Sequence, residues 1–167
     1  MAEPFLELHP QDAGRLGLRP ATLAQVESPL GRAVLRVLVT DRVAPGQPFA
    51  PMHWTAETAP TGRVDALVPA LTDPVSGQPA LKSAQVAIRP FAAAWYGFAV
   101  SAGPITPRAD YWARATLPKG QQVELAGGAL PEDWIQEARA LFGLTGDPLV
   151  MQDRRRGHLG QALVRDG

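Results

Sequence analysis

Cysteine is absent from this chain of 167 residues, which excludes disulfides, thiolate zinc sites, iron–sulfur ligation and cysteine nucleophiles within it. Excess charge of one sign is also missing, because 16 basic residues balance 16 acidic ones. We expect no nucleic-acid partner, since such partners require a basic surface. No apolar run reaches the ~18 residues of a membrane span, and the N-terminus lacks a signal-peptide pattern. We therefore expect a cytoplasmic chain without a membrane partner.

Familiar catalytic signatures are missing as well. The three histidines, His9, His53 and His158, are far apart and form no H-x-x-x-H or H-x-H pair, so the sequence gives little support for a metal site. There is no G-x-S-x-G elbow and no glycine-rich nucleotide loop. The residues by themselves name no reaction, and we assign no catalytic residue and no metal ligand.

Proline and glycine are abundant, with 17 and 16 residues, and they divide the chain into short elements. This pattern disfavours a helical bundle and predicts a mainly β fold. The apolar run within residues 33–40 indicates a strand that is buried on both faces. Other strands are expected at residues 5–9, 22–27, 85–89, 94–101, 111–116 and 121–126, with short ones near 150 and 159–164. Helices are expected at residues 10–16 and 131–142.

Residues 45–82 differ from the rest of the chain. His53, Trp54, Asp65 and Lys82 stand there among prolines and glycines with no repeating period. Proline fixes φ and glycine accepts positive φ, so the segment has a defined loop path. Polar and aromatic groups on such loops often form binding sites. The alternative for each residue is an ordinary turn former or surface side chain, so the residues alone predict a small-molecule or interdomain site and nothing more specific.

Five stretches follow one another in a fixed order: L-E-L-H-P-Q-D-A-G-R-L-G-L, V-E-S-P-L-G-R-A, V-A-P-G-Q-P-F-A-P-M-H-W, D-A-L-V…T-D-P-V-S-G-Q-P-A-L-K and V-A-I-R-P. Together they resemble the molybdopterin dinucleotide-binding domain of the molybdopterin oxidoreductases, the dimethyl sulfoxide reductase family. The sequences M-H-W and T-D-P-V-S-G-Q-P, followed by A-W-Y-G-F, are most similar to those of assimilatory nitrate reductases. The resemblance covers about residues 3–101.

The resemblance implies a closed, six-stranded double-psi β-barrel with short helices over residues 3–90. A small α+β extension would follow over residues 91–167. In this family the barrel closes over one end of a bis-molybdopterin guanine dinucleotide cofactor. The cofactor-binding residues that the resemblance implies are Met52, His53, Trp54, Asp65 and Lys82.

The sequence also departs from the family. An asparagine of the family has become Asp65, which replaces an amide donor with a charge. The molybdenum ligand, the iron–sulfur cysteines, the other domains and the opening T-G-R…H-x-x-T segment are not in the sequence. We therefore expect a fragment of a molybdenum oxidoreductase resembling nitrate reductase, whose partners are the remaining domains of the parent reductase. Alone, it should have no reductase activity and poor cofactor affinity.

Two other functions remain open from the sequence. A free-standing β-barrel without a cofactor would be a protein-interaction module, and the aromatic strand around residues 95–98 would face its partner. An independent hydrolase would use His53 with Asp65. The first of these is the main rival to the cofactor-binding function.

Overall fold

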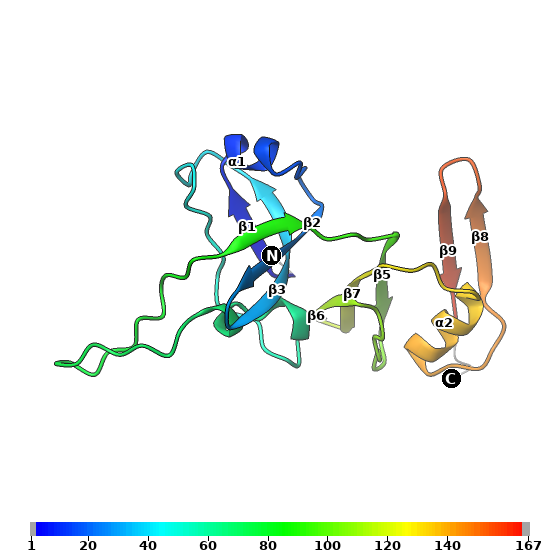
Figure 1. Cartoon of the computed structure of the whole chain (residues 1–167). Helices are drawn as coiled ribbons and strands as arrows, with labels where there is room; N and C mark the ends of the chain where they lie inside the picture. The colour runs from blue at the N-terminus through cyan, green and yellow to red at the C-terminus, as the bar shows by residue number, and fades with distance from the viewer. Residues whose placement is uncertain (1–2, 165–167) are drawn as a thin grey trace.

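The computed structural model describes residues 3–164, which form three separate β-sheets (Figure 1). The strands are β1 (Phe5–Leu8), β2 (Leu23–Ser28), β3 (Gly31–Val39), β4 (Ala87–Pro90), β5 (Trp95–Ser101), β6 (Tyr111–Leu117), β7 (Gly120–Gly127), β8 (Leu149–Asp153) and β9 (His158–Ala162). The helices are α1 (Pro10–Arg15), the 3-10 helices η1 (Pro60–Gly62) and η2 (Val64–Leu67), and α2 (Trp134–Phe142). The mainly β fold is confirmed, and most element boundaries lie within two residues of those expected.

The four-stranded sheet has the order β1-β3-β2-β4, with β1 parallel to β3 and the other pairs antiparallel. Side chains alternate between the two faces of a strand. Leu35 and Val37 of β3 therefore join one apolar cluster, while Val34 joins another on the opposite face. The expectation of a strand buried on both faces is confirmed.

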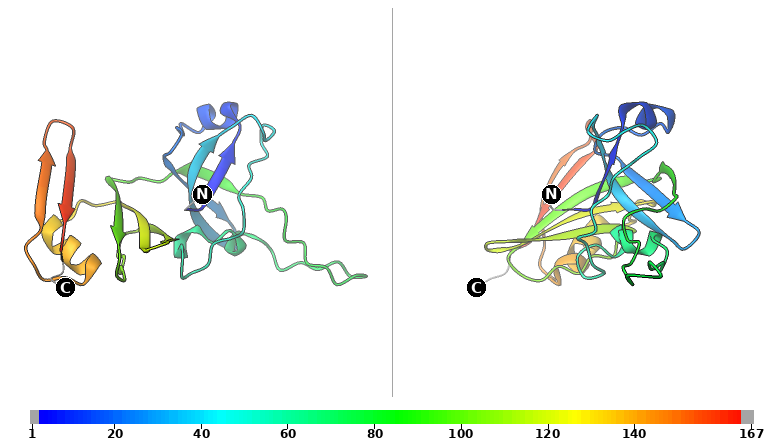
Figure 2. Two further views of the ribbon diagram at one scale, coloured as in Figure 1. Left: turned by 180° about the vertical axis from the view of Figure 1, so that it is seen from behind. Right: turned by 90° about the vertical axis from the view of Figure 1, so that its left-hand side faces the viewer.

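Apolar clusters join the elements into successive layers (Figures 1 and 2). The first lies between the four-stranded sheet, α1 and η2. The second joins Leu23 and Val34 to Tyr111 and Ala113 of the three-stranded sheet, which has the order β5-β7-β6. The third lies on the far face of that sheet, where the end of α2 packs. Strands β8 and β9 form a separate hairpin.

A closed six-stranded barrel is not confirmed. Closure requires every strand to pair on both sides. Within residues 3–164, β4 pairs only with β2, and the outer edge of β1 meets only the isolated bridge between Glu7 and Phe49. The sheet is therefore open and has four strands within the described residues.

Helix α2 begins later than its sequence indicates. Proline at residue 131 predicts a first turn there, but Asp133 is the N-cap: its Oδ1 accepts hydrogen bonds from the backbone N–H groups of Ile135 (2.8 Å) and Gln136 (3.2 Å). An aspartate that satisfies two free N–H groups defines the start more strongly than a proline does. Gly143 ends the helix as expected, with a φ of 63°.

A network of ionic hydrogen bonds joins the two larger sheets. The carboxylate of Glu3 accepts two hydrogen bonds from Arg36, both at 2.9 Å, and one from the hydroxyl of Tyr111 at 2.7 Å. Arg36 also donates to the backbone oxygen of Ala21 and lies over the rings of Tyr96 and Tyr111. Burial, together with the nearby Glu3 carboxylate, raises the pKa of Tyr111 far above its usual range, so the phenol remains a donor.

Replacing Tyr111 with Phe removes the donor to Glu3 and leaves the ring in place. We expect Y111F to lower the free energy of unfolding by about 1–2 kcal/mol, the cost of losing a buried bond to a charged group. Urea denaturation of the purified chain measures this. The matched control is Y96F, at the other tyrosine of the chain, which is half-exposed and whose hydroxyl forms no hydrogen bond with residues 3–164. Equal destabilisation by both variants would contradict the role of the network.

Asp12 predicts a loss of stability in acid. Its carboxylate is buried and accepts hydrogen bonds from the backbone N–H of Gly46 (2.6 Å) and from Arg15 (3.1 Å). The Gly46 bond, followed by Arg15, holds the pKa of Asp12 below its ordinary 3.8. The stabilisation is therefore fully present above that value and is lost as the pH falls through the lower folded pKa. We expect D12N to have a weaker dependence of the urea midpoint on pH between about pH 4 and pH 2 than the parent chain.

Candidate functional site

The segment between β3 and β4 contains the residues that the sequence singles out. Part of it is anchored to both larger sheets: the N–H of Arg114 donates to the oxygen of Thr58 at 2.7 Å, and Ala59 is fully buried between the sheets. Gly62 lies so close to Pro4 that a Cβ atom there would collide with the proline ring. The loop path in this part is therefore fixed by contacts with the sheets.

Trp54 is held by the sheet on one side. Its ring packs edge-on against Phe5 of β1, with the ring centroids 6.0 Å apart, and it contacts the cluster between the two sheets. The neighbouring His53 is exposed, with its ring centroid 6.4 Å from that of Trp54. Trp54 thus forms a firm aromatic wall, whereas His53 lies on the solvent side.

Asp65 forms a bidentate ion pair with Arg63. Nη2 of Arg63 donates to one carboxylate oxygen at 2.6 Å, and Nε donates to the other at 3.2 Å. This pairing lowers the pKa of Asp65 below its ordinary value and raises that of Arg63. The charge of Asp65 is therefore balanced two residues away. The R-V-D spacing was the available signal for this pair, and the sequence reasoning missed Arg63.

A cavity of about 380 Å³ brings several of these side chains together. It is lined by Met52, Trp54, Val64, Asp65, Val68, Pro69, Ala70 and Leu81. Three of the five predicted cofactor-binding residues, Met52, Trp54 and Asp65, thus share one cavity. His53 and Lys82 do not line it, although Lys82 directly follows a lining residue. The cavity combines apolar walls with one carboxylate, which suits a flat, partly apolar molecule that carries N–H donors.

Residues 70–85 form an arm that projects from the molecule (Figures 1 and 2). Every residue in it is exposed, and the side chain of Val75 is 95% exposed. The tip is nevertheless ordered: Oδ1 of Asp73 accepts hydrogen bonds from the N–H groups of Val75 (3.0 Å) and Ser76 (2.7 Å) and from the Ser76 hydroxyl (2.9 Å). These bonds hold the pKa of Asp73 below its ordinary value. Lys82 lies at the base of this arm, five residues before β4.

The contacts of these residues bear on the hydrolase alternative and on metal binding. No hydrogen bond joins His53 to Asp65 among the described residues, and Asp65 is already paired with Arg63, so the hydrolase alternative gains no support. Residues 3–164 contain no group of three or more His, Cys, Asp or Glu side chains placed to hold a metal ion.

None of the helices in that range is long and apolar enough to cross a bilayer.

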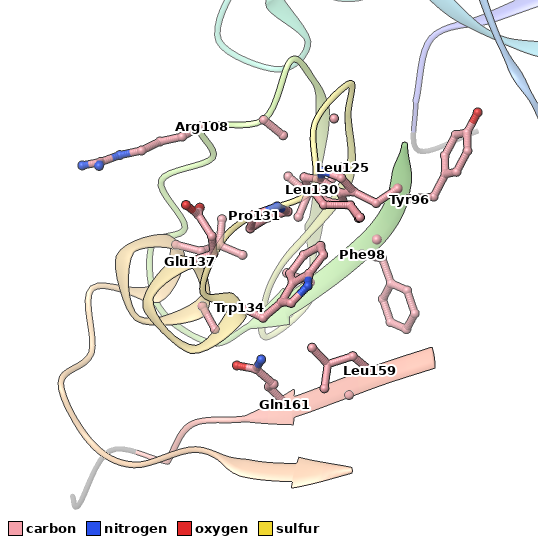
Figure 3. Close-up of a pocket in the computed structure, with 18 of the residues that line it drawn as sticks. Tyr96, Phe98, Arg108, Leu125, Leu130, Pro131, Trp134, Glu137, Leu159 and Gln161 are labelled. Atoms are coloured by element: carbon pink, nitrogen blue, oxygen red, sulfur yellow. The ribbon is translucent and has the colours of Figure 1, made fainter. Parts of the chain in front are cut away.

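A larger groove of about 1050 Å³ lies elsewhere, between β5, α2 and β9 (Figure 3). None of the predicted cofactor-binding residues lines it. Its residues lie far apart in the sequence, which is why no motif in the sequence indicated it.

Comparison with known proteins connects the small cavity to a family. The family model described as "Molydopterin dinucleotide binding domain" matches residues 1–85. A "Nitrate reductase" of Klebsiella oxytoca is 40% identical over 136 residues, which cover 81% of this chain and 16% of that protein. An "Assimilatory nitrate reductase catalytic subunit" of Bacillus subtilis is 31% identical over 88 residues, 53% of this chain and 12% of that protein. A "Nitrate reductase" of Synechocystis sp. is 45% identical over 60 residues, 36% of this chain and 8% of that protein.

The family model matches half of the chain, and its range contains every residue of the small cavity. The chain spans less than a fifth of each of these three longer reductases. It therefore belongs to the molydopterin dinucleotide binding domain family and corresponds to one portion of nitrate-reductase-like enzymes.

Proposed function

We propose that the chain is the cofactor-covering portion of a longer, molybdenum-dependent nitrate reductase, where it binds one end of a bis-molybdopterin guanine dinucleotide. The observation that carries this proposal is the cavity inside the family-matched stretch, where Met52, Trp54 and Asp65 meet. The reductases named above support nitrate as the substrate, and the assimilatory relative supports a role in nitrate assimilation. We place this role in the cytoplasm as part of the proposal.

The residues of the cavity fit such a cofactor. A pterin is a flat heteroaromatic molecule whose edge carries N–H donors. Trp54, Met52 and Leu81 offer apolar walls, and the oxygens of Asp65 retain lone pairs beyond those that Arg63 uses. The exposed ammonium of Lys82 is a point charge suited to phosphate or pterin oxygens.

This chain would bind and shield the cofactor. When bound, the cofactor supplies the metal centre for oxygen-atom transfer. Trp54 and the apolar walls would exclude water from one end of it, Asp65 would orient its polar edge, and Lys82 would offset negative charge. Among residues 3–164 no hydrogen bond joins His53 to Asp65, whose carboxylate pairs with Arg63. We propose that catalysis takes place in the intact enzyme.

The longer enzyme would also complete the fold. We propose that residues 3–90 form part of a double-psi β-barrel, that residues 91–167 form an extension, and that strands from the parent polypeptide close the barrel. The outer edge of β4, which has no partner among residues 3–164, is available for pairing. Mass measurement of the native gene product tests this, because a native chain of only 167 residues would contradict it.

A free-standing interaction module without a cofactor is the second candidate. The exposed apolar side chains Leu71, Val75, Tyr96 and Phe98 favour it, because such groups commonly contact other proteins. A native protein of this length that lacks molybdenum would favour the module over the reductase.

Lys82 should contribute to cofactor retention. We expect K82A in the full-length enzyme to weaken cofactor binding about 10-fold or more, because a charge-assisted hydrogen bond contributes about 1.5–3 kcal/mol. Molybdenum content per protein after dialysis measures the loss. The matched control is K119A, at the only other lysine of the chain, which lies exposed at the β6–β7 turn. Unchanged molybdenum content and activity in K82A would rule out this role for Lys82.

Asp65 should act through its acceptor oxygens. We expect D65N to retain most of the bound molybdenum, because the amide keeps one acceptor oxygen, and D65A to lose it. Molybdenum analysis of both variants in the full-length enzyme, beside a thermal unfolding curve, separates cofactor loss from unfolding. Equal retention by D65A and D65N would contradict a direct contact.

A further inference from the structure

An aromatic contact fixes the position of α2 beside the large groove. Trp134 of α2 packs edge-on against Trp95 of β5, with the ring centroids 5.2 Å apart, and this contact holds the helix against the three-stranded sheet. Figure 3 shows Phe98 of β5 and Leu159 of β9 near each other, and Trp134 of α2 on the other side of β5. The groove therefore lies between a sheet edge and a hairpin, and its lining mixes apolar side chains with polar ones such as Arg108 and Gln161.

One side of this groove is the unprotected edge of strand β5. Within residues 3–164, β5 pairs only with β7, so half of its backbone N–H and C=O groups have no strand partner. Tyr96, Phe98 and Val100 are every second residue of β5, so their side chains share one face of the sheet. They are 49%, 73% and 55% exposed. Natural proteins protect free edges with charges, prolines or bulges. Strand β5 has no charged residue and no proline, so its edge is suited to pairing.

The hairpin on the other side of the groove also lacks cover. Every residue of β8 is exposed, including Leu149 at 72%, Val150 at 52% and Met151 at 77%, although these three side chains do not line the groove. An isolated two-stranded hairpin is marginally stable in water, because it buries little apolar surface. The hairpin residues that do line the groove include the apolar Leu159 and the polar Gln152 and Gln161, so a strand placed there would give the hairpin a packing partner.

We propose that an extended segment of the longer reductase polypeptide, from outside residues 1–167, lies in this groove and pairs with β5 as a fourth strand. The segment would span the seven residues of β5, about 23 Å. Side chains on one of its faces would lie beside Tyr96 and Phe98, and side chains on its other face would lie beside Trp95 and Trp134. A carboxylate near one end would pair with Arg108, which lines the groove and has no carboxylate partner among residues 3–164.

The proposal rests on the part of the proposed function that makes this chain a portion of a longer enzyme. The match to the Klebsiella oxytoca protein covers 136 residues, whereas the family model covers 85, so at least 51 matched residues lie beyond residue 85. The walls of the groove thus lie largely in sequence shared with that reductase. The matched stretch is 16% of that protein, which leaves ample polypeptide to supply the strand.

Hydrogen exchange tests the pairing directly. We compare the isolated chain 1–167 with the full-length enzyme by mass spectrometry, following peptides that contain residues 95–101. The outward-facing amides should exchange at least about 100-fold more slowly in the full-length enzyme, because they gain strand partners. Equal exchange in the two proteins would overturn the proposal. So would slow exchange in the isolated chain that depends on its concentration, since that result indicates pairing between copies.

A variant locates the protecting contact. F98R in the full-length enzyme places a charge on the exposed apolar face of β5, beside the position of the added strand, and we expect it to restore fast exchange in residues 95–101. L30R is the matched control, because Leu30 is 61% exposed in the β2–β3 turn and does not line the groove. Retained protection in F98R would overturn the proposal.

Molybdenum content separates this inference from the proposed cofactor binding. A protected β5 without molybdenum contradicts only the proposed cofactor, whereas bound molybdenum with an unprotected β5 contradicts only this inference.

Discussion

The carboxylate of Glu3 is the contact on which the arrangement of the two larger sheets depends. It accepts hydrogen bonds from Arg36 of one sheet and from Tyr111 of the other. A largely buried charge is tolerated only when its partners satisfy it, and this requirement restricts how the sheets can be placed. Because its pKa is raised, Tyr111 remains an O–H donor at any physiological pH.

The candidate cofactor cavity depends on this interface. Trp54, its aromatic wall, contacts the cluster in which Leu23 and Val34 of one sheet meet Tyr111 of the other. Tyr111 lies outside the range that the family model matches, so a residue beyond position 85 helps to position Trp54. The candidate cavity therefore depends on contacts outside the matched range.

Local sequence patterns predicted much of the fold correctly. Each prediction that differs from the structure does so for a physical reason. The apolar run of β3 and the glycine that ends α2 act through neighbouring residues, so the sequence alone predicts them correctly. The start of α2 was missed because Asp133 outcompetes the proline before it. Of the residues that the sequence singled out, Met52, Trp54 and Asp65 share a cavity, but the position of Lys82 outside its lining and the pairing of Asp65 with Arg63 depend on the loop path.

The sequence by itself determined the family, the alternation of strands and turns, and the irregular segment that contains the candidate site. These properties depend on residue types and on short spacings that a linear chain displays. Only the tertiary structure decided that the four-stranded sheet stays open and that a groove runs beside the free edge of β5. Closure and edge exposure depend on which distant strands meet, and long-range pairing leaves no local pattern in a single sequence.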